Sequence, residues 1–143
     1  MNRPGRRTFI IASVFLFLVG CLHAYGSTVK TTDPGLLAIE ATQRSFHVPL
    51  GLGMEPSLLA LEKSITLTMS ILLLWLGALG VLIGMSDASP QVLRRFTIVN
   101  LLGCGALVFL YAHYRIPPPL VSLALVEMMF VLALLRQALG YQK

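Results

Sequence analysis

Charged residues are scarce in this chain. Only 12% of its 143 residues are Asp, Glu, Lys or Arg, which is about half the charged fraction of a typical soluble domain. Hydrophobic residues make up 56% of the sequence. A helix of a soluble protein carries a polar face along its length, and the apolar runs of this chain lack one. The composition excludes an ordinary water-soluble domain and predicts that lipid surrounds most of the chain.

Acidic residues are also few, with 6 Asp and Glu against 11 Lys and Arg, giving a formal net charge of +5. A nucleic-acid-binding segment would gather its basic residues in one place and interleave them with aromatic residues. The basic residues of this chain are not gathered on one segment. We therefore expect no nucleic-acid partner, and we interpret the positive charge as a signal of membrane topology.

Cysteine is rare, and the sequence motifs of soluble active sites are missing. Cys21 and Cys104 have no CxxC spacing and both fall inside apolar runs, so neither a zinc site nor a redox pair is indicated. The GxxxxGK[ST], HExxH, GxSxG and GxGxxG patterns are absent as well. Because Ser, His and Asp are not grouped as a nucleophile requires, we predict no catalytic residue, metal or resident cofactor. An enzyme of this sequence would have to act within the membrane.

What the sequence does contain is four apolar runs, at residues 8–25, 65–84, 96–114 and 119–135. Roughly 20 helical residues, at ~1.5 Å each, cross the ~30 Å hydrocarbon layer of a bilayer. Short connections at 86–90 and 115–119 make the joined helices antiparallel neighbours. We predict a single all-α membrane domain, 1–143, folded as an up-down four-helix bundle. Its helices are expected at about 8–25, 56–84, 96–114 and 119–138, with an outer loop at 26–55.

The outer loop is predicted to be partly ordered. Two helix starts are indicated, where Asp33 precedes Pro34 and where Glu55 precedes Pro56, because proline favours the first turn of a helix. A continuous helix through the loop is interrupted by Pro49, Gly51 and Gly53. Apolar surface for the bilayer interface or for the helix ends is offered by Leu36, Leu37, Ile39 and Phe46.

The distribution of basic residues predicts the orientation, because cytoplasmic loops are enriched in Lys and Arg. With the N-terminus inside, seven basic residues are cytoplasmic: Arg3, Arg6, Arg7, Arg94, Arg95, Arg136 and Lys143. Four lie outside: Lys30, Arg44, Lys63 and Arg115. We therefore expect a multi-pass protein of the bacterial inner membrane with both termini in the cytoplasm.

The first residues permit another interpretation. Arg6-Arg7 resembles a twin-arginine export signal, and Leu18-Val19-Gly20-Cys21 fits the pattern that is cut before a lipidated cysteine. If both were used, Cys21 would begin a lipoprotein with three membrane helices. The simpler interpretation is that two arginines before a first helix satisfy the positive-inside rule. One inserted helix also anchors a protein far better than acyl chains do.

Glu127 is the acidic residue that most suggests function. It lies about 8 residues and ~12 Å inside the last predicted helix, where an ionised carboxylate costs at least ~2.5 kcal/mol. It must therefore face other helices or be neutral. We predict a proton or substrate site, with a structural hydrogen-bonded acid as the alternative. Candidate partners at comparable depth are Asn100, Cys104, Trp75 and Ser70.

All three histidines, His23, His47 and His113, fall on the predicted outer side. Histidine, tyrosine and tryptophan at helix ends commonly anchor a protein at the interface, and Tyr25, Tyr111 and Tyr114 accompany these histidines. The alternatives are axial ligation of haem by His23 and His113, a metal site that these histidines form with a carboxylate, or a pocket for a quinone or a lipid headgroup.

Small residues recur on two of the predicted helices. One carries Ser70, Gly77, Gly80 and Gly84, and the next carries Gly103 and Gly105. Small residues let membrane helices approach closely, since packing rather than the hydrophobic effect holds such helices together. We predict that these positions pack the helices of one chain, with a homo-oligomer interface as the alternative.

The layout as a whole resembles small bacterial four-helix membrane protein families of a DoxX-like kind. The resemblance rests on His23 closing the first helix, the polar outer loop, the small-residue second helix and the stretch Tyr114-Arg115-Ile116-Pro117-Pro118-Pro119. It implies an architecture and carries over no catalytic residue.

Three functions remain open at this point. The first is a non-enzymatic accessory or assembly component, whose partners are the bilayer and other membrane proteins or further copies of this chain. The second is a small proton-coupled transporter that uses Glu127. The third is an intramembrane haem, quinone or lipid-acting protein that uses His23 and His113.

Overall fold

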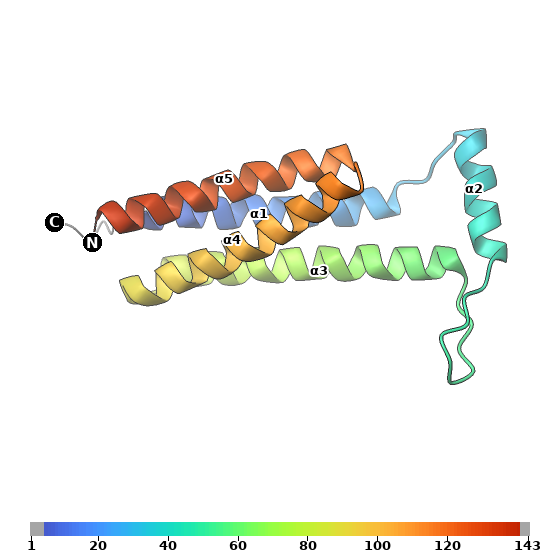
Figure 1. Cartoon of the computed structure of the whole chain (residues 1–143), viewed down its shortest axis with the longest axis horizontal. Helices are drawn as coiled ribbons and strands as arrows, with labels where there is room; N and C mark the ends of the chain where they lie inside the picture. The colour runs from blue at the N-terminus through green and yellow to red at the C-terminus, as the bar shows by residue number, and fades with distance from the viewer. Residues whose placement is uncertain (1–4, 141–143) are drawn as a thin grey trace. The chain divides into compact units, whose positions relative to one another are not determined.

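The computed structural model describes residues 5–140, except for the side chains of residues 117 and 118. Met1, Arg3 and Lys143, which enter the orientation prediction, lie outside the described residues, as do the side chains of Pro117 and Pro118. Five helices follow one another along the chain: α1 (Arg6–Thr28), α2 (Pro34–Ser45), α3 (Leu58–Met85), α4 (Pro90–His113) and α5 (Pro117–Leu139) (Figure 1). The described range contains one isolated bridge and no strand. The all-α prediction is confirmed.

Helices α1, α3, α4 and α5 are each long and apolar enough to cross a membrane. They correspond to the four predicted helices. The additional helix, α2, lies within the predicted outer loop and begins at the indicated Asp33-Pro34 start. There the carboxylate of Asp33 accepts a hydrogen bond from the backbone nitrogen of Leu36 at 3.0 Å and so caps the helix.

Helix α3 begins at Leu58, within two residues of the predicted start at about 56. The predicted start of the next helix is wrong. Helix α4 begins at Pro90 and not at residue 96, because Ser89 caps it and Pro90 occupies the first turn. The polar first turns of α4 concealed this start from a search for apolar runs.

The chain divides into two compact units. Unit 1 comprises Met1–Val19 and Leu73–Lys143, and unit 2 comprises Gly20–Leu72. Helices α1 and α3 each contribute residues to both units. The single-domain organisation stays a prediction.

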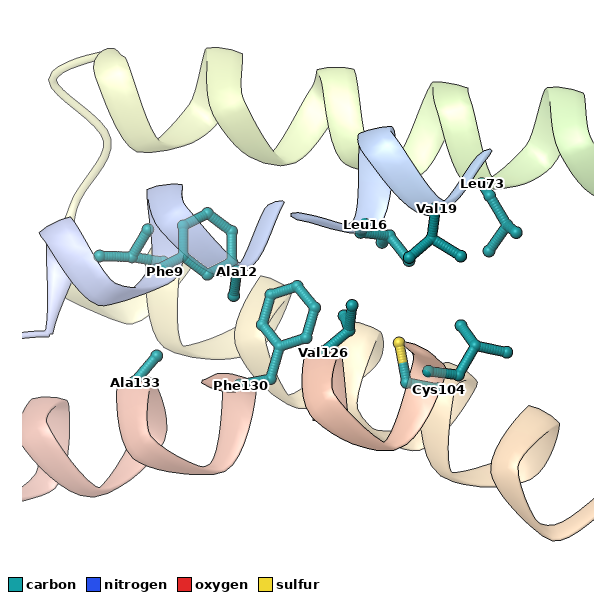
Figure 2. Packing of buried hydrophobic residues seen from close by; sticks show 11 residues of the cluster. Phe9, Ala12, Leu16, Val19, Leu73, Cys104, Val126, Phe130 and Ala133 are labelled. Atoms are coloured by element: carbon teal, nitrogen blue, oxygen red, sulfur yellow. The ribbon is translucent and has the colours of Figure 1, made fainter. Parts of the chain in front are cut away.

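The core of unit 1 is built from narrow stripes in which buried positions recur at spacings of three and four residues. The stripes are 9, 12, 16 and 19 on α1; 73, 77, 80 and 84 on α3; 93, 97, 100 and 104 on α4; and 123, 126, 130, 133 and 137 on α5. This is the periodicity of helices that pack side by side as in a coiled coil. Within this core, the rings of Phe9 and Phe130 lie 5.9 Å apart between centroids (Figure 2).

Glycine allows α1 and α3 to approach closely within unit 1. A Cβ atom built on Gly77 would come within 2.5 Å of the Phe17 nitrogen, and one on Gly80 within 2.8 Å of the Ser13 Cβ. Gly84 lies in the same way against Ile10. Because the residue numbers fall on α1 as they rise on α3, the two helices are antiparallel here.

Unit 2 contains the end of α1, all of α2 and the start of α3. Two polar contacts hold α2 against α3: Gln43 donates a hydrogen bond to Glu62 at 2.9 Å, and Lys63 lies 3.8 Å from Glu40. No residue of α2 is buried. The order of α2 therefore depends on its cap and on these polar contacts rather than on a core of its own.

Candidate functional sites

The carboxyl group of Glu127 lies against α4 in unit 1. A Cβ atom built on Gly105 would come within 2.9 Å of Glu127 Oε1, so the absence of a side chain at Gly105 makes room for the carboxyl. The neighbouring Cys104 is buried and lies close enough for its sulfur to interact electrostatically with Glu127. Glu127 itself is half-buried. The structure therefore brings Glu127, Gly105 and Cys104 together between α4 and α5.

The other predicted partners of Glu127 are placed differently. Asn100 is buried on the same stripe of α4 as Cys104, and its side-chain nitrogen donates to the Phe96 carbonyl at 2.9 Å. Its Oδ1 atom is buried and has no hydrogen-bond partner within the described residues. Trp75 is 63% exposed, so its ring is not part of the group around Glu127. Ser70 belongs to unit 2.

A polar cluster that was not predicted from the sequence lies at the other end of unit 1. Gln137 donates from Nε2 to the hydroxyl oxygen of Thr97 at 3.0 Å, and both side chains are buried. Arg136 donates to the Thr8 hydroxyl at 2.8 Å. Arg6 donates to the Gly84 carbonyl at 2.5 Å and to the Ser86 carbonyl at 2.8 Å. This cluster joins the start of α1 to the ends of α3 and α5 and to the start of α4.

Part of this cluster could have been predicted from polar residues that lie in register with the apolar stripe of their helix. Gln137 follows Phe130 by seven residues on α5, and Thr97 precedes Cys104 by seven on α4. A polar side chain at such a position points into the core and needs a partner there. No comparable pattern marks Arg6, whose bonds go to backbone carbonyls.

His23 makes a defined hydrogen bond within unit 2. Its Nδ1 atom lies 3.1 Å from the hydroxyl oxygen of the buried Ser70. The Ser70 hydroxyl also lies 2.9 Å from the Thr66 carbonyl, so it bonds both His23 and its own helix.

The other two histidines have surface environments. His113 stacks on Phe109 and meets Tyr114 edge to face, with ring centroids 6.3 Å and 5.0 Å apart. His47 is exposed, and its Nδ1 lies 3.1 Å from the Ser45 carbonyl. Within residues 5–140 no three His, Cys, Asp or Glu side chains are grouped as a metal site would require. Aromatic packing at a helix end is the environment that an interfacial anchor has.

The small residues fall into two groups. Gly77, Gly80 and Gly84 are fully engaged by α1, as described above. By contrast, a Cβ atom on Gly103 would meet nothing within 4 Å, so this glycine is open on the surface of α4.

Comparisons of the chain with protein-family models, curated proteins and solved structures find no match. The DoxX-like resemblance accordingly stays a prediction.

Proposed function

We propose that the chain is a multi-pass protein of the bacterial inner membrane and that its four long helices form an up-down bundle. The exposed side chains of these helices support the proposal. They are large and apolar along the helices, and they include Phe15, Leu72, Leu102, Phe109 and Leu132. Soluble monomers rarely expose apolar surface so extensively, whereas hydrocarbon covers it without cost.

The contacts of unit 1 support an even number of crossings. Gly5, at the start of α1, packs against Gln137, near the end of α5, so both ends of the described chain lie on one side. The same end carries Arg6 and Arg136, which belong to the arginine-rich side of the orientation prediction. We place this end in the cytoplasm because of the positive-inside rule.

The role we propose is that of an accessory or assembly component without turnover of its own. The observation that carries it is α2, a helix of 12 residues with no buried residue. A helix of this length is marginal in water unless its side chains pack against something. Leu36, Leu37 and Ile39 are all about half-exposed on α2. They form a surface that is suited to covering by a partner membrane protein.

Site-specific photo-crosslinking tests the partner surface. A photoreactive residue at Leu37 is expected to give one discrete adduct with a membrane protein in intact cells. The matched control is the same residue at Leu72, which is exposed on α3 and which we expect to meet lipid. An adduct of the same mass from both positions, or none from Leu37, would contradict a partner surface on α2.

Cysteine labelling tests the proposed topology. A cysteine replacing Gln43 is expected to react with an impermeant maleimide in intact cells, whereas tags fused at Met1 and Lys143 are expected to stay protected. Labelling of either terminal tag from outside would contradict the proposed crossings.

A proton-coupled transporter is the second candidate, because Glu127 is half-buried beside Gly105 and Cys104 between two apolar helices. Intramembrane acids that face other helices often mark a substrate or proton pathway. Glu127→Gln keeps the shape of the side chain and removes its charge. Proton-coupled flux in proteoliposomes that disappears in Glu127→Gln would favour transport. If the chain is an accessory protein, the photo-crosslinked adduct formed at Leu37 is expected to be unchanged in this variant.

A further inference from the structure

Residues 46–58, between α2 and α3, form a closed hairpin. Its arms are joined by backbone hydrogen bonds from Leu58 to the Phe46 carbonyl at 2.8 Å and from Val48 to the Pro56 carbonyl at 3.0 Å. At the tip, Leu50 donates to the Met54 carbonyl at 3.0 Å. The hairpin is therefore a projection whose two arms are joined by backbone hydrogen bonds along their length.

The tip of the hairpin exposes an apolar side chain on a residue with an unusual backbone conformation. Leu52 is 96% exposed and has a φ angle of 52°, in the left-handed region. Few residues other than glycine adopt this conformation, and it is least uncommon for Asn and Asp. Gly51 and Gly53 on either side also have positive φ angles, of 83° and 75°. A strained residue that shows its apolar side chain to the outside indicates a function for that side chain.

The tip is also uncharged. No Asp, Glu, Lys or Arg occurs between His47 and Glu55. Leu50 and Met54, which flank the turn, are each about half-exposed. The tip thus offers three apolar side chains together, without a charge that would have to be paired or desolvated on entry into an apolar environment.

The direction of the hairpin suits a membrane surface. Within unit 2 it leaves the first turn of α3 sideways, crosswise to the axis of that helix (Figure 1). The apolar run of α3 begins at Ile65, about 10 Å along the helix from Leu58 at ~1.5 Å per residue. If α3 crosses the bilayer, the hairpin runs along its outer surface at the level of the headgroups.

We propose that this hairpin tip, Leu50 to Met54, inserts into the outer interface of the bilayer that holds the chain. The inference rests on the proposed membrane-spanning function. The interface retains water for backbone groups that are not bonded internally, and burial of apolar side chains in it is favourable. A protein pocket would also accept leucines, but the absence of any charge to orient docking and the sideways course of the hairpin favour lipid.

Fluorescence quenching in lipid nanodiscs tests the proposal. The label is an environment-sensitive dye on Leu50→Cys, in a Cys21→Ser, Cys104→Ala chain. A nitroxide attached near the lipid headgroups is expected to quench the dye at least about twofold, and iodide in the water is expected to quench it less than it quenches free dye. Leu52→Ser should reduce the nitroxide quenching, and Leu52→Met should not.

A second label on Leu72→Cys separates this inference from the proposed function. Leu72 is exposed on α3 and should be quenched by a nitroxide carried deep in the acyl chains. If the Leu72 label is quenched and the Leu50 label responds only to iodide, the hairpin does not insert and the insertion proposal fails, while the membrane-spanning proposal stands. If the Leu72 label is not quenched by lipid, both proposals fail.

Discussion

The backbone of Phe17 on α1 lies directly against Gly77 on α3. A Cβ atom at Gly77 would come within 2.5 Å of the Phe17 nitrogen and 2.7 Å of its Cα. Backbone atoms of a helix cannot move aside as the end of a flexible side chain can. Even the smallest side chain at this position must therefore separate the two helices.

Gly77→Ala is expected to lower the free energy of unfolding by ~1–3 kcal/mol, because overpacking of a close helix contact has this cost. Gly103→Ala is the matched control, since nothing lies within 4 Å of its added methyl group. Its unfolding free energy should be unchanged or higher by up to about 1 kcal/mol, from helix propensity. Titration of the detergent-solubilised protein with SDS measures both. Equal losses in the two variants would show that the α1–α3 contact is not as close as described.

Arg6 and Arg7 are expected to differ in their contributions to stability. Arg6 bonds the carbonyls of Gly84 and Ser86 at the end of α3, whereas Arg7 is exposed and makes no side-chain hydrogen bond or ion pair within the described residues. Arg6→Gln should lower the free energy of unfolding by ~1–2 kcal/mol, because it removes hydrogen bonds from a charged donor. Arg7→Gln should leave it nearly unchanged.

The same pair of variants tests the twin-arginine interpretation. An export signal would need both arginines, so each variant would reduce membrane insertion to a similar extent. Normal insertion of Arg7→Gln together with a destabilised Arg6→Gln is the result expected if the pair is structural. Insertion measured from the membrane fraction of expressing cells decides between the two.

Hydropathy alone predicted the four long helices, because an apolar run of this length has few other structures open to it. The start of α2 was also predictable, since the cap is local: Asp33 and Pro34 act within one turn of chain. The start of α4 was not predicted. Ser89 and Pro90 give the same cap-and-proline signal as Asp33 and Pro34, but polar residues follow them, so the apolar run of this helix begins later.

The candidate sites were less predictable than the helices, for a physical reason. The depth of Glu127 can be counted along one helix, but its partner depends on which face of α4 meets α5. The rotation of α4 places Gly105 against the carboxyl. In the same way, the rotation of α3 leaves Trp75 largely exposed. The hairpin tip depends on the positive φ angle of Leu52, which leucine rarely adopts and no sequence pattern indicated.

The first helix is expected to remain in the mature protein. Phe9, Ala12 and Leu16 of α1 are buried in the core of unit 1, and the glycines of α3 are fitted to this helix. Cleavage before Cys21 would remove these three residues and expose the stripes that they cover. Intact mass spectrometry of the purified protein should therefore find residues 1–20 attached and Cys21 unmodified. A mass corresponding to a diacylated chain that begins at Cys21 would contradict the structure.

The hydrogen bond between Gln137 and Thr97 allows a test of which polar atoms stabilise the core. The Thr97 hydroxyl donates to the Leu93 carbonyl at 2.8 Å and accepts from Gln137. The Oε1 atom of Gln137 is already buried without a partner within the described residues. Thr97→Val would leave the other end of this amide unpaired as well, which is expected to cost ~1–2 kcal/mol of unfolding free energy.

Gln137→Met should cost less than Thr97→Val, because it removes the whole amide, including the unpaired Oε1, and leaves the Thr97 hydroxyl bonded to Leu93. Methionine is chosen because it is unbranched like glutamine, and Gly5 packs closely against this side chain. In the Gln137→Met background, Thr97→Val should then lose less stability than it does alone. The difference, a coupling of ~0.5–1.5 kcal/mol, measures the hydrogen bond itself. Additive losses would mean that the two side chains do not interact, and the polar cluster would then not join α4 to α5.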